Sequence, residues 1–456
     1  MNLQNRDVLV VGTGLSGAGA VRLLHREGAR ITVLEQNEKM TPEAVRERLH
    51  EDDRAAVRIV TGAYPEGGEK TLALAVFSPA VPMDSPLALR LRAAGVPIWS
   101  EIELGFRAAR GRIAAITGTN GKTTTTSLVG AIMRAACPSV YVVGNIGFSY
   151  AGIAAETTEQ TVCVAEISSF QLEGICDFHP QVSAILNITP DHLNRHHTME
   201  NYIAAKERIA ENQTRDDVCV LNYGDAALRA FGEKRCPASV VWFSSRTKLT
   251  DGYFLDGEEI CLAEDGQVRR LMNIHEMRLV GLCNVENVMA AIAVARAMGV
   301  EMKTILATVR TFAPVEHRIE FVATKRGVDY YNDSKGTNPD AAIQGIRAMA
   351  KPTVLIGGGY DKGSAYDEWI EAFDGKVKEL VLIGQTKEAI AACARSHGFT
   401  RISLFETFEE ALRHCTQIAA SGDAVLLSPA CASWGMFPNY EVRGQIFKDY
   451  VRKLPD

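Results

Sequence analysis

The sequence contains no closely spaced pair of cysteines, although it has ten cysteines in 456 residues. Most of them lie inside apolar segments, such as Cys163 in TVCVAEI and Cys219 in DVCVLN, where a buried thiol is the usual state. We therefore expect reduced, structural cysteines in a cytoplasmic protein, and no disulfide framework.

Long hydrophobic runs and an excess of basic residues are also missing. No apolar run approaches the roughly 20 residues that cross a bilayer, and residues 1–7 lack the apolar core of a signal peptide. The net charge of −6 gives no electrostatic reason to expect a nucleic-acid partner. We expect neither a membrane nor a nucleic acid among the partners, and the lack of a coiled-coil pattern favours a monomer.

The residues that are present indicate an α/β fold of three domains. A strand, a glycine turn and a helix recur along the chain, which predicts parallel sheets covered by helices. We predict a Rossmann-like domain over residues 1–100, a central P-loop-type domain with a parallel sheet over 101–314, and a C-terminal Rossmann-like domain over 315–456. The second boundary is placed at Pro314, after an Ala-rich helix predicted at Val285–Met298.

The stretch 251–270 alternates in polarity and differs from the rest of the middle domain. It contains the turn pairs Asp251-Gly252, Asp256-Gly257 and Asp265-Gly266. Such pairs between short alternating segments predict small antiparallel hairpins.

The first glycine loop, Gly12 to Gly17, satisfies the GxGxxG pattern between a predicted strand at 7–11 and a predicted helix at Ala18–Glu27. Glycines let the backbone approach a pyrophosphate, and the helix N-terminus supplies unpaired N–H groups. Glu35, at the end of the next predicted strand, could accept a ribose hydroxyl. On its own the loop predicts a dinucleotide site, and the alternative is a glycine turn that only packs helix on strand.

The second glycine loop is a shortened P-loop of the form Gly-x-x-Gly-Lys-Thr. It follows the strand pattern RIAAIT and precedes a helix predicted at Thr124–Met133. Backbone N–H groups and the lysine can hold triphosphate oxygens, and a threonine hydroxyl can bind Mg²⁺. The residues predicted to bind ATP here are Gly118, Thr119, Asn120, Gly121, Lys122, Thr123 and Thr124.

The two loops together restrict the class of enzyme. A dehydrogenase needs the first loop and not the second. A kinase or a ligase needs the second loop, and can use the first for a nucleotide-tagged substrate.

A series of longer motifs, read in order along the chain, resembles the Mur ligase family. The motifs are TGTNGKTTTT, VGNIG, EISSFQLE, NITPDHLNRH, YIAAKERI, NDSKGTN, and LSPACAS with a following Phe437 and Arg-Gly pair. Within that family, NDSKGTN and SPACAS with Phe437 resemble the D-glutamate-adding members. The resemblance implies an ATP-dependent, amide-forming ligase that joins D-glutamate to UDP-N-acetylmuramoyl-L-alanine through an acyl phosphate, in peptidoglycan synthesis.

The resemblance also implies two Mg²⁺ ions and a set of catalytic residues, namely Lys122, Glu166, His192 and Lys206. Glu166 and Thr123 resemble ligands of one Mg²⁺, and a carboxylate at a strand end beside a phosphate loop suits that ion. His192 resembles a ligand of the second, although the residue alone would be taken for a loop histidine.

Lys206 resembles a lysine that is carbamylated in the family, which converts a cation into an anion. A plain ammonium beside Mg²⁺ would be repelled, so a lysine at the metal makes sense if it is converted. The neighbours of His192, namely His196 and His197, are interpreted as ordinary loop residues.

The remaining site residues are carried over one by one from the matching motifs. The residues implied for UDP-N-acetylmuramoyl-L-alanine are Leu15, Ser16, Gly17 and Asn145. The further residues implied for ATP are Asn287, Arg318 and Asp333. The residues implied for D-glutamate are Lys335, Thr337, Lys362, Ser428 and Phe437.

Three positions depart from the family pattern. Cys283 stands where a histidine is common, Ala80 stands where a glycine is usual, and Glu35 to Asn37 offer no basic residue for the pyrophosphate. Three alternatives stay open: an NAD-dependent oxidoreductase built on GTGLSG and Glu35, a catalytically silent nucleotide-binding module, and a ligase for a different amino acid.

Overall fold

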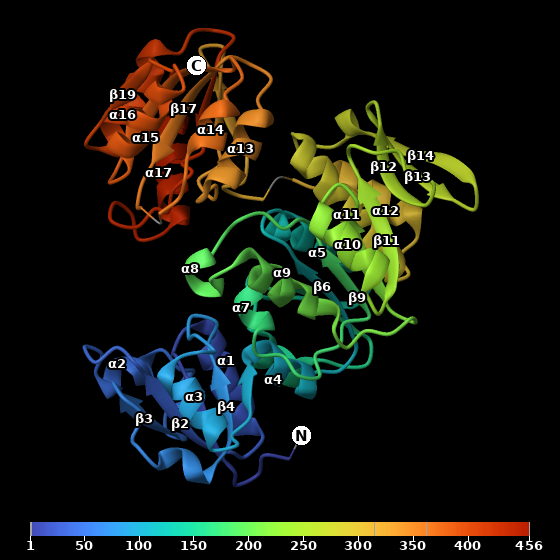
Figure 1. Cartoon of the computed structure of the whole chain (residues 1–456), viewed down its shortest axis with the longest axis vertical. Coiled ribbons are helices and arrows are strands. Elements are labelled where there is room, and N and C mark those ends of the chain that lie inside the picture. The colour runs from blue at the N-terminus through green and yellow to red at the C-terminus, as the bar shows by residue number, and fades with distance from the viewer. Residues whose placement is uncertain (1, 314, 362, 456) are drawn as a thin grey trace. The chain divides into compact units, whose positions relative to one another are not determined.

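The computed structural model describes residues 2–313, 315–361 and 363–455. The predicted boundary at Pro314 and the predicted acceptor-binding Lys362 therefore lie outside the described residues. The chain divides into two compact units, one formed by Met1–Met272 with Asn287–Val309 and the other by Asn273–Glu286 with Arg310–Asp456. The α/β class predicted from the sequence is confirmed: parallel-rich sheets alternate with helices along the chain (Figure 1).

The first sheet has five strands in the order β3-β2-β1-β4-β5, and all its neighbouring pairs are parallel. Its strands are β1 (Asp7–Val11), β2 (Arg30–Glu35), β3 (Val57–Thr61), β4 (Leu72–Phe77) and β5 (Ile98–Ser100). Its helices are α1 (Leu15–Arg26), α2 (Pro42–Glu47) and α3 (Pro86–Ala93). The order reverses between β1 and β4, and ligands of open α/β sheets bind at such a point.

The second sheet has nine strands in the order β14-β13-β12-β11-β10-β9-β6-β8-β7. Its strands are β6 (Arg112–Thr117), β7 (Ser139–Gly144), β8 (Thr161–Glu166), β9 (Val182–Ile185), β10 (Val218–Asn222), β11 (Ser239–Ser244), β12 (Gly252–Asp256), β13 (Glu259–Glu264) and β14 (Gln267–Asn273). Its pairs from β7 to β12 are parallel, and β12 and β13 are antiparallel.

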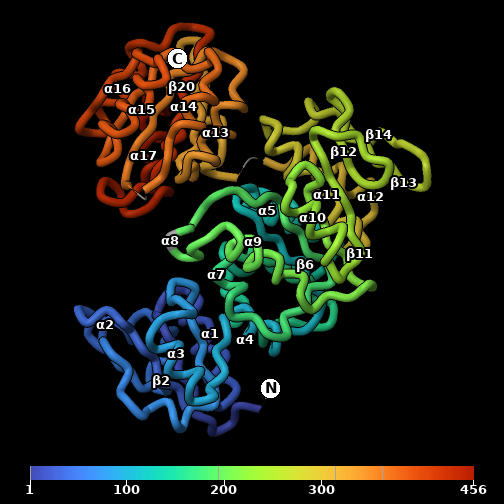
Figure 2. Tube along the Cα trace, viewed as in Figure 1, coloured from blue at the N-terminus to red at the C-terminus, as the bar shows by residue number. Residues whose placement is uncertain are grey.

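The hairpins predicted over 251–270 are largely confirmed, and their path at the edge of the second sheet can be followed in Figure 2. The turns lie at Asp256-Gly257 and Asp265-Gly266 as expected. The hairpin turn predicted at Asp251-Gly252 is wrong, because Gly252 begins β12 and that strand is parallel to β11.

Helices α4 (Glu101–Ala108) to α12 (Met302–Thr311) accompany the second sheet in the chain. The others are α5 (Lys122–Ala136), α6 (Tyr150–Ile153), α7 (Ser169–Leu172), α8 (Leu193–His196), α9 (Met199–Glu207), α10 (Ala226–Lys234) and α11 (Leu282–Ala297). Helix α5 was predicted to begin at Thr124 and begins two residues earlier, so Lys122 lies in its first turn.

The third sheet has six strands in the order β15-β16-β20-β17-β18-β19. Its strands are β15 (Glu320–Lys325), β16 (Val328–Asn332), β17 (Thr353–Gly358), β18 (Val377–Ile383), β19 (Ile402–Leu404) and β20 (Ala424–Leu427). Its helices are α13 (Pro339–Arg347), α14 (Asp367–Glu371), α15 (Lys387–Ser396), α16 (Phe408–Ile418) and α17 (Tyr440–Arg452). Only β15 runs antiparallel to its neighbour within this described sheet.

Within the first unit, α6 packs against both α1 and α4. The buried Glu101 accepts hydrogen bonds at Oε1 from Ser149 Oγ (2.6 Å) and from the Ala151 N–H (2.7 Å). Burial raises the pKa of Glu101, because the charged carboxylate is removed from water. Gly19 of α1 lies so close to α6 that a Cβ on it would be 1.9 Å from Ser149 Oγ. Helix α1, which follows the first glycine loop, is therefore positioned by contact with α4 and α6.

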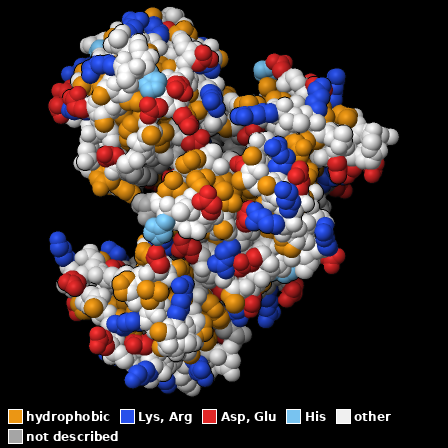
Figure 3. Space-filling view, viewed as in Figure 1, with side chains coloured by type: hydrophobic (Ala, Val, Ile, Leu, Met, Phe, Trp, Pro, Cys, Tyr) orange, Lys and Arg blue, Asp and Glu red, His pale blue; other side chains and the backbone are white. Residues whose placement is uncertain are grey.

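On the face of the molecule in Figure 3, acidic and basic side chains are interspersed rather than collected into patches of one sign. No helix in the described part of the chain is long and apolar enough to cross a bilayer.

The close approach of α1 to α6 predicts a steric effect at Gly19. Gly19→Ala should lower the free energy of unfolding by about 1–3 kcal/mol, because Ser149 cannot move away without losing its bond to Glu101. Gly152→Ala is the matched control, since a Cβ there meets ordinary contacts of 3.4 Å or more. Urea unfolding of both variants measures the difference, and equal midpoints would contradict the packing argument.

Candidate functional site

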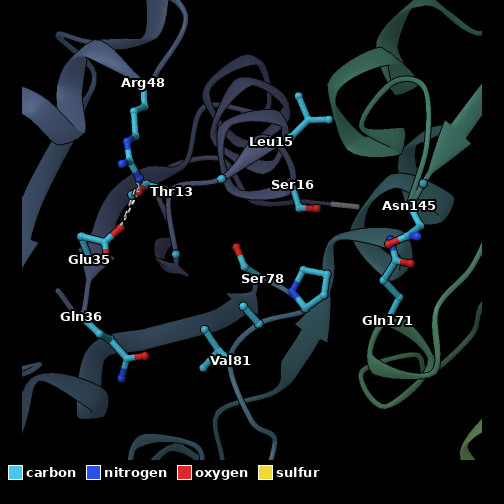
Figure 4. A pocket seen from close by; sticks show the side chains of 15 residues that line it. Thr13, Leu15, Ser16, Glu35, Gln36, Arg48, Ser78, Val81, Asn145 and Gln171 are labelled. Atoms are coloured by element: carbon cyan, nitrogen blue, oxygen red, sulfur yellow. Dashed lines mark hydrogen bonds and ion pairs between the residues drawn. The ribbon is translucent and has the colours of Figure 1, made fainter. Parts of the chain in front are cut away.

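A cavity of about 530 Å³ opens at the carboxyl end of the first sheet, between the first glycine loop and the second sheet's loops (Figure 4). Its lining residues are Gly12, Thr13, Gly14, Leu15, Ser16, Glu35, Gln36, Arg48, Ser78, Pro79, Ala80, Val81, Gly144, Asn145 and Gln171. Leu15, Ser16 and Asn145, which the sequence predicts to bind one substrate, are brought together here. Gly17 is not among the lining residues, and its Cα packs behind the loop against the Gly12 carbonyl.

One end of this cavity carries a cation that the sequence analysis missed. Arg48 follows α2 and its Nη1 donates a hydrogen bond to Thr13 Oγ1 at 3.1 Å. Thr13 Oγ1 in turn donates to Glu35 Oε2 at 2.5 Å, and all three side chains meet in Figure 4. The lack of a basic residue between Glu35 and Asn37 is therefore offset by Arg48, which lies thirteen residues further along the chain. Because Arg48 lies after α2, outside the glycine loop and β2, no local sequence motif indicates that its side chain reaches the cavity.

The second glycine loop joins β6 to α5 and is held by residues outside it. Asn187 accepts a hydrogen bond from the Asn120 N–H at its Oδ1 (2.8 Å) and one from the Thr119 N–H at its carbonyl (2.9 Å). Gly121 has a φ of +83°, and a Cβ there would lie 2.1 Å from Asn287 Oδ1. Asn287, predicted to read the ATP base, thus lies directly beside the loop, and only glycine fits at 121.

Two lysines converge on the carbonyl of Gly118. Lys122 Nζ donates to it at 2.9 Å, and Lys206 Nζ donates to it at 2.8 Å. Lys206 is only 2% exposed, and burial lowers its pKa well below the ordinary value, with the charge of Lys122 adding to the effect. The carboxylates of Asp191 and Glu166 oppose this shift. Lys206 is therefore a buried amine beside the phosphate loop, unlike a solvated surface lysine.

Glu166 ends β8 and is 1% exposed. Its Oε1 accepts a hydrogen bond from Asn145 Nδ2 at 2.8 Å, which connects it to the lining of the cavity. Its Oε2 is buried without a hydrogen-bond partner in the part of the chain that the structure describes. A carboxylate oxygen of this kind is a ligand that Mg²⁺ prefers, so Glu166 fits that ion.

His192 lies at the start of α8 with a φ of +54°. Its side chain is 42% exposed, and its Nε2 lies 3.5 Å from Asp191 Oδ2. The negative charge of Asp191 also opposes the lowering of the pKa of Lys206. The sequence analysis did not single out Asp191, although it lies within the motif NITPDHLNRH.

The interpretation of His196 as an ordinary loop residue is wrong. It ends α8, is 5% exposed, and its Nε2 lies 2.9 Å from Ser169 Oγ. Its ring is stacked on Phe170 and packs against Tyr202. Burial lowers the pKa of His196 to about 4, so the ring is neutral at physiological pH. It holds the segment that carries His192 against α7 and α9.

In the second unit, the predicted residues gather where parallel strands end. Asp333 follows β16 and Ser428 follows β20, and Ser428 Oγ donates to Asp333 Oδ2 at 2.7 Å. Burial raises the pKa of Asp333 to about 6, although the nearby guanidinium of Arg318 works in the opposite direction. A residue predicted for ATP and one predicted for D-glutamate are thus in direct contact.

The other described residues predicted for D-glutamate contact residues other than Asp333 and Ser428. Lys335 lies with its Nζ 5.4 Å from the centre of the Tyr440 ring, and the Thr337 N–H donates to the Lys335 carbonyl. Phe437 packs edge-on against Phe408, which belongs to a core cluster under α16.

Arg443 of α17 is a fully buried guanidinium that the sequence analysis did not single out. Its Nε and Nη2 donate to Ser334 Oγ (3.0 Å) and Ser334 O (2.7 Å), and its Nη1 donates to Cys431 O (3.3 Å). It therefore ties NDSKGTN to SPACAS. Arg443 belongs to the Arg-Gly pair of the last motif, which indicated that the residue matters. The sequence does not show that its side chain is buried.

Comparisons with known proteins show which family the chain resembles. Residues 116–295 match the model of the Mur ligase middle domain, and residues 317–431 match that of the Mur ligase glutamate ligase domain. The chain is 55% identical to UDP-N-acetylmuramoylalanine--D-glutamate ligase of Lachnospira eligens and 51% identical to that of Lachnoclostridium phytofermentans, over all of each chain. Among solved structures, MurF ligase from Thermotoga maritima in complex with ADP matches with a TM-score of 0.59 and 17% identity, over 99% of this chain and 96% of that one. The last likeness concerns the fold alone.

The raised pKa of Asp333 predicts a stability effect with a defined sign. Between pH 4 and pH 6 the unfolded state releases this proton and the folded state keeps it, so stability falls as pH rises and the penalty is complete above pH 6. Asp333→Asn should therefore have a free energy of unfolding higher than that of the unchanged protein at pH 7.5, by on the order of 2 kcal/mol. The difference should disappear towards pH 4, and urea unfolding at the two pH values measures it.

Asp329 on the same strand supplies the matched control. Burial opposes its ionisation, but hydrogen bonds from Lys351 and Thr324 hold the pKa of Asp329 below its ordinary value. Asp329→Asn should therefore destabilise the protein at pH 7.5. Loss of stability in both variants at pH 7.5 would contradict the assignment for Asp333.

Proposed function

Because this chain belongs to the Mur ligase family, we propose that it is an ATP-dependent ligase that adds D-glutamate to UDP-N-acetylmuramoyl-L-alanine in peptidoglycan synthesis. The relatives that are 55% and 51% identical over their full length carry the name of that reaction. The acceptor amine attacks an acyl phosphate that ATP forms on the alanine carboxylate, and the products are the amide, ADP and phosphate.

The observation that carries the proposal is the hydrogen bond between Asn145 and Glu166. It joins the cavity beside the first glycine loop to the carboxylate beside the phosphate loop, at 2.8 Å. A UDP-sugar bound with its nucleotide near Thr13, Glu35 and Arg48 has its muramoyl-alanine end directed towards Asn145. A substrate carboxylate near Asn145 then lies close to the transferred phosphoryl group.

Phosphoryl transfer to a carboxylate brings two anions together, and the chain supplies cationic groups for it. Lys122 leaves the Gly118 and Thr119 carbonyls to bind ATP phosphate oxygens, and the loop N–H groups do the same. Mg²⁺, when bound, neutralises phosphate charge and orients the oxygens. Glu166 and the hydroxyl of Thr123 would hold one ion, and His192 with a carbamylated Lys206 would hold the second.

Carbamylation of Lys206 is supported by its surroundings. The lowered pKa of this buried amine increases the fraction of the neutral form, which adds CO₂ and releases a proton to give an anionic carbamate. The added carboxylate would remove the repulsion between Lys206 and Lys122. It would also supply the oxygen ligands that a second hard cation requires.

The acceptor is assigned to the second unit. Lys335, Thr337, Ser428 and Phe437, with Lys362, are proposed to bind D-glutamate, since ammonium and hydroxyl donors suit its two carboxylates. Asp333 would hold Ser428 in place, and Arg318 would contact ATP phosphates. The NAD-dependent alternative leaves Lys122, Glu166 and Lys206 without a role.

The enzyme is proposed to act as a monomer in the cytoplasm. ATP and UDP-sugars, the two nucleotide substrates of the reaction, are both made and used in that compartment.

The proposed reaction predicts phosphate release that depends on one acceptor. With ATP, Mg²⁺ and UDP-N-acetylmuramoyl-L-alanine, we expect release with D-glutamate and about 100-fold less with L-glutamate, L-alanine or diaminopimelate, because the acceptor groups are positioned for one stereoisomer. Release with another of these acceptors would keep the ligase chemistry and overturn the acceptor assignment. Release with none of them would favour a silent nucleotide-binding module.

Carbamylation predicts a separate signal at Lys206. Protein equilibrated with ¹³C-bicarbonate should give a carbamate carbon resonance that Lys206→Met lacks and that Lys234→Met, an exposed control in α10, retains. Lys206→Met should also reduce kcat by about 100-fold or more, because the second metal loses a ligand. An unchanged carbon spectrum in Lys206→Met would exclude this modification.

A further inference from the structure

Two helices of the second unit each present a pair of metal-binding side chains at a spacing of four residues. Helix α14 carries Asp367 and Glu371, and the end of α15 carries Cys393 and His397. Residues four apart lie on the same face of a helix, and α14 packs against α15 (Figure 1). None of these residues has a part in the proposed ligase reaction.

Three of the four side chains form one cluster, and Glu371 lies beside its histidine. Cys393 Sγ lies 4.0 Å from His397 Nδ1. His397 Nε2 lies 3.7 Å from Asp367 Oδ1 and 3.7 Å from Glu371 Oε1. One ligand atom from each of Asp367, Cys393 and His397 lies within 4.8 Å of the others. The edges of a tetrahedral zinc site measure about 3.3–3.7 Å, given bond lengths of about 2.0–2.3 Å. Small rotamer adjustments of exposed side chains therefore suffice to complete a site.

The histidine is already oriented as a ligand. Its Nδ1 lies 3.0 Å from the carbonyl oxygen of Cys393, which can only accept, so Nδ1 carries the proton. In the neutral ring the lone pair is then on Nε2, which faces the two carboxylates. A backbone carbonyl that fixes the tautomer in this way is the usual outer contact of a metal-bound histidine.

We propose that Asp367, Glu371, Cys393 and His397 form a binding site for a divalent transition-metal ion of the Zn²⁺ class. Sulfur and imidazole donors select Zn²⁺ over Mg²⁺, and two carboxylates with one thiolate more than balance the charge of the ion. Cys393 would lose its proton when the metal binds, because the thiolate is the form that binds metal. The ion would clamp α14, from Asp367 at its start to Glu371 at its end, to the end of α15.

The alternative occupant is a proton. A protonated His397 would form ion pairs with Asp367 and Glu371, and Cys393 would remain a thiol. The two states differ in their sulfur chemistry, because only a metal ion makes Cys393 a bound thiolate.

The test uses the full-length protein, freed of metal by chelation and kept reduced in saturating Mg²⁺ so that the phosphate-loop site is filled. Zn²⁺ binding is measured by competition with a chromophoric chelator, and Co²⁺ is added separately to record the visible and near-ultraviolet spectrum. The variants are Cys393→Ser and His397→Gln, with Cys137→Ser as a matched control at a partly exposed cysteine of the first unit.

We expect one Zn²⁺ per chain and a thiolate-to-Co²⁺ charge-transfer band, both retained in Cys137→Ser. Cys393→Ser should lose the band, and both site variants should bind Zn²⁺ at least tenfold more weakly. Thermal unfolding without metal shows that the variants are folded. A hundredfold excess of Zn²⁺ over its Kd should raise the midpoint by about 5 °C in the unchanged protein and in Cys137→Ser, and by less in the two site variants. Equal Zn²⁺ affinity in all four proteins, or a Co²⁺ spectrum without a thiolate band, would overturn the proposal.

Discussion

The amine groups of Lys122 and Lys206 both donate to the backbone carbonyl of Gly118, at 2.9 and 2.8 Å. Burial and the nearby charge of Lys122 lower the pKa of Lys206, and the carboxylates of Glu166 and Asp191 oppose that shift. The second glycine loop, α9 and the end of β8 are therefore brought together around one buried amine, and the rest of the site depends on how its charge is balanced.

The same constraint accounts for the link to the first sheet. Glu166 uses one carboxylate oxygen to accept from Asn145 and keeps the other without a partner among the described residues. Asn145 belongs to the lining of the cavity that begins at Thr13 and Arg48. The cavity beside the first glycine loop and the buried carboxylate at the end of β8 are therefore connected through one hydrogen-bonded pair. Their relative position does not depend on a flexible connection, because α1, α4 and α6 are packed together.

The sequence predicted the α/β class, the two glycine loops and the strand ends that carry Glu166, because these follow from local periodicity and turn chemistry. It could not predict features that depend on packing between distant segments. Arg48 enters the cavity from a helix beyond β2, and His196 is buried although its sequence neighbours are polar. The contact between Asp333 and Ser428 joins residues 95 positions apart, so no local pattern could have shown it.

The central claim is that ATP phosphorylates the carboxylate of the sugar-nucleotide substrate beside Asn145 and Glu166. The direct measurement is the fate of ¹⁸O in that carboxylate during turnover with ATP and D-glutamate. The account predicts that one ¹⁸O atom per turnover appears in the released phosphate, because the acyl C–O bond breaks when the amine attacks. Phosphate without ¹⁸O, or label found in AMP, would contradict an acyl phosphate at this site.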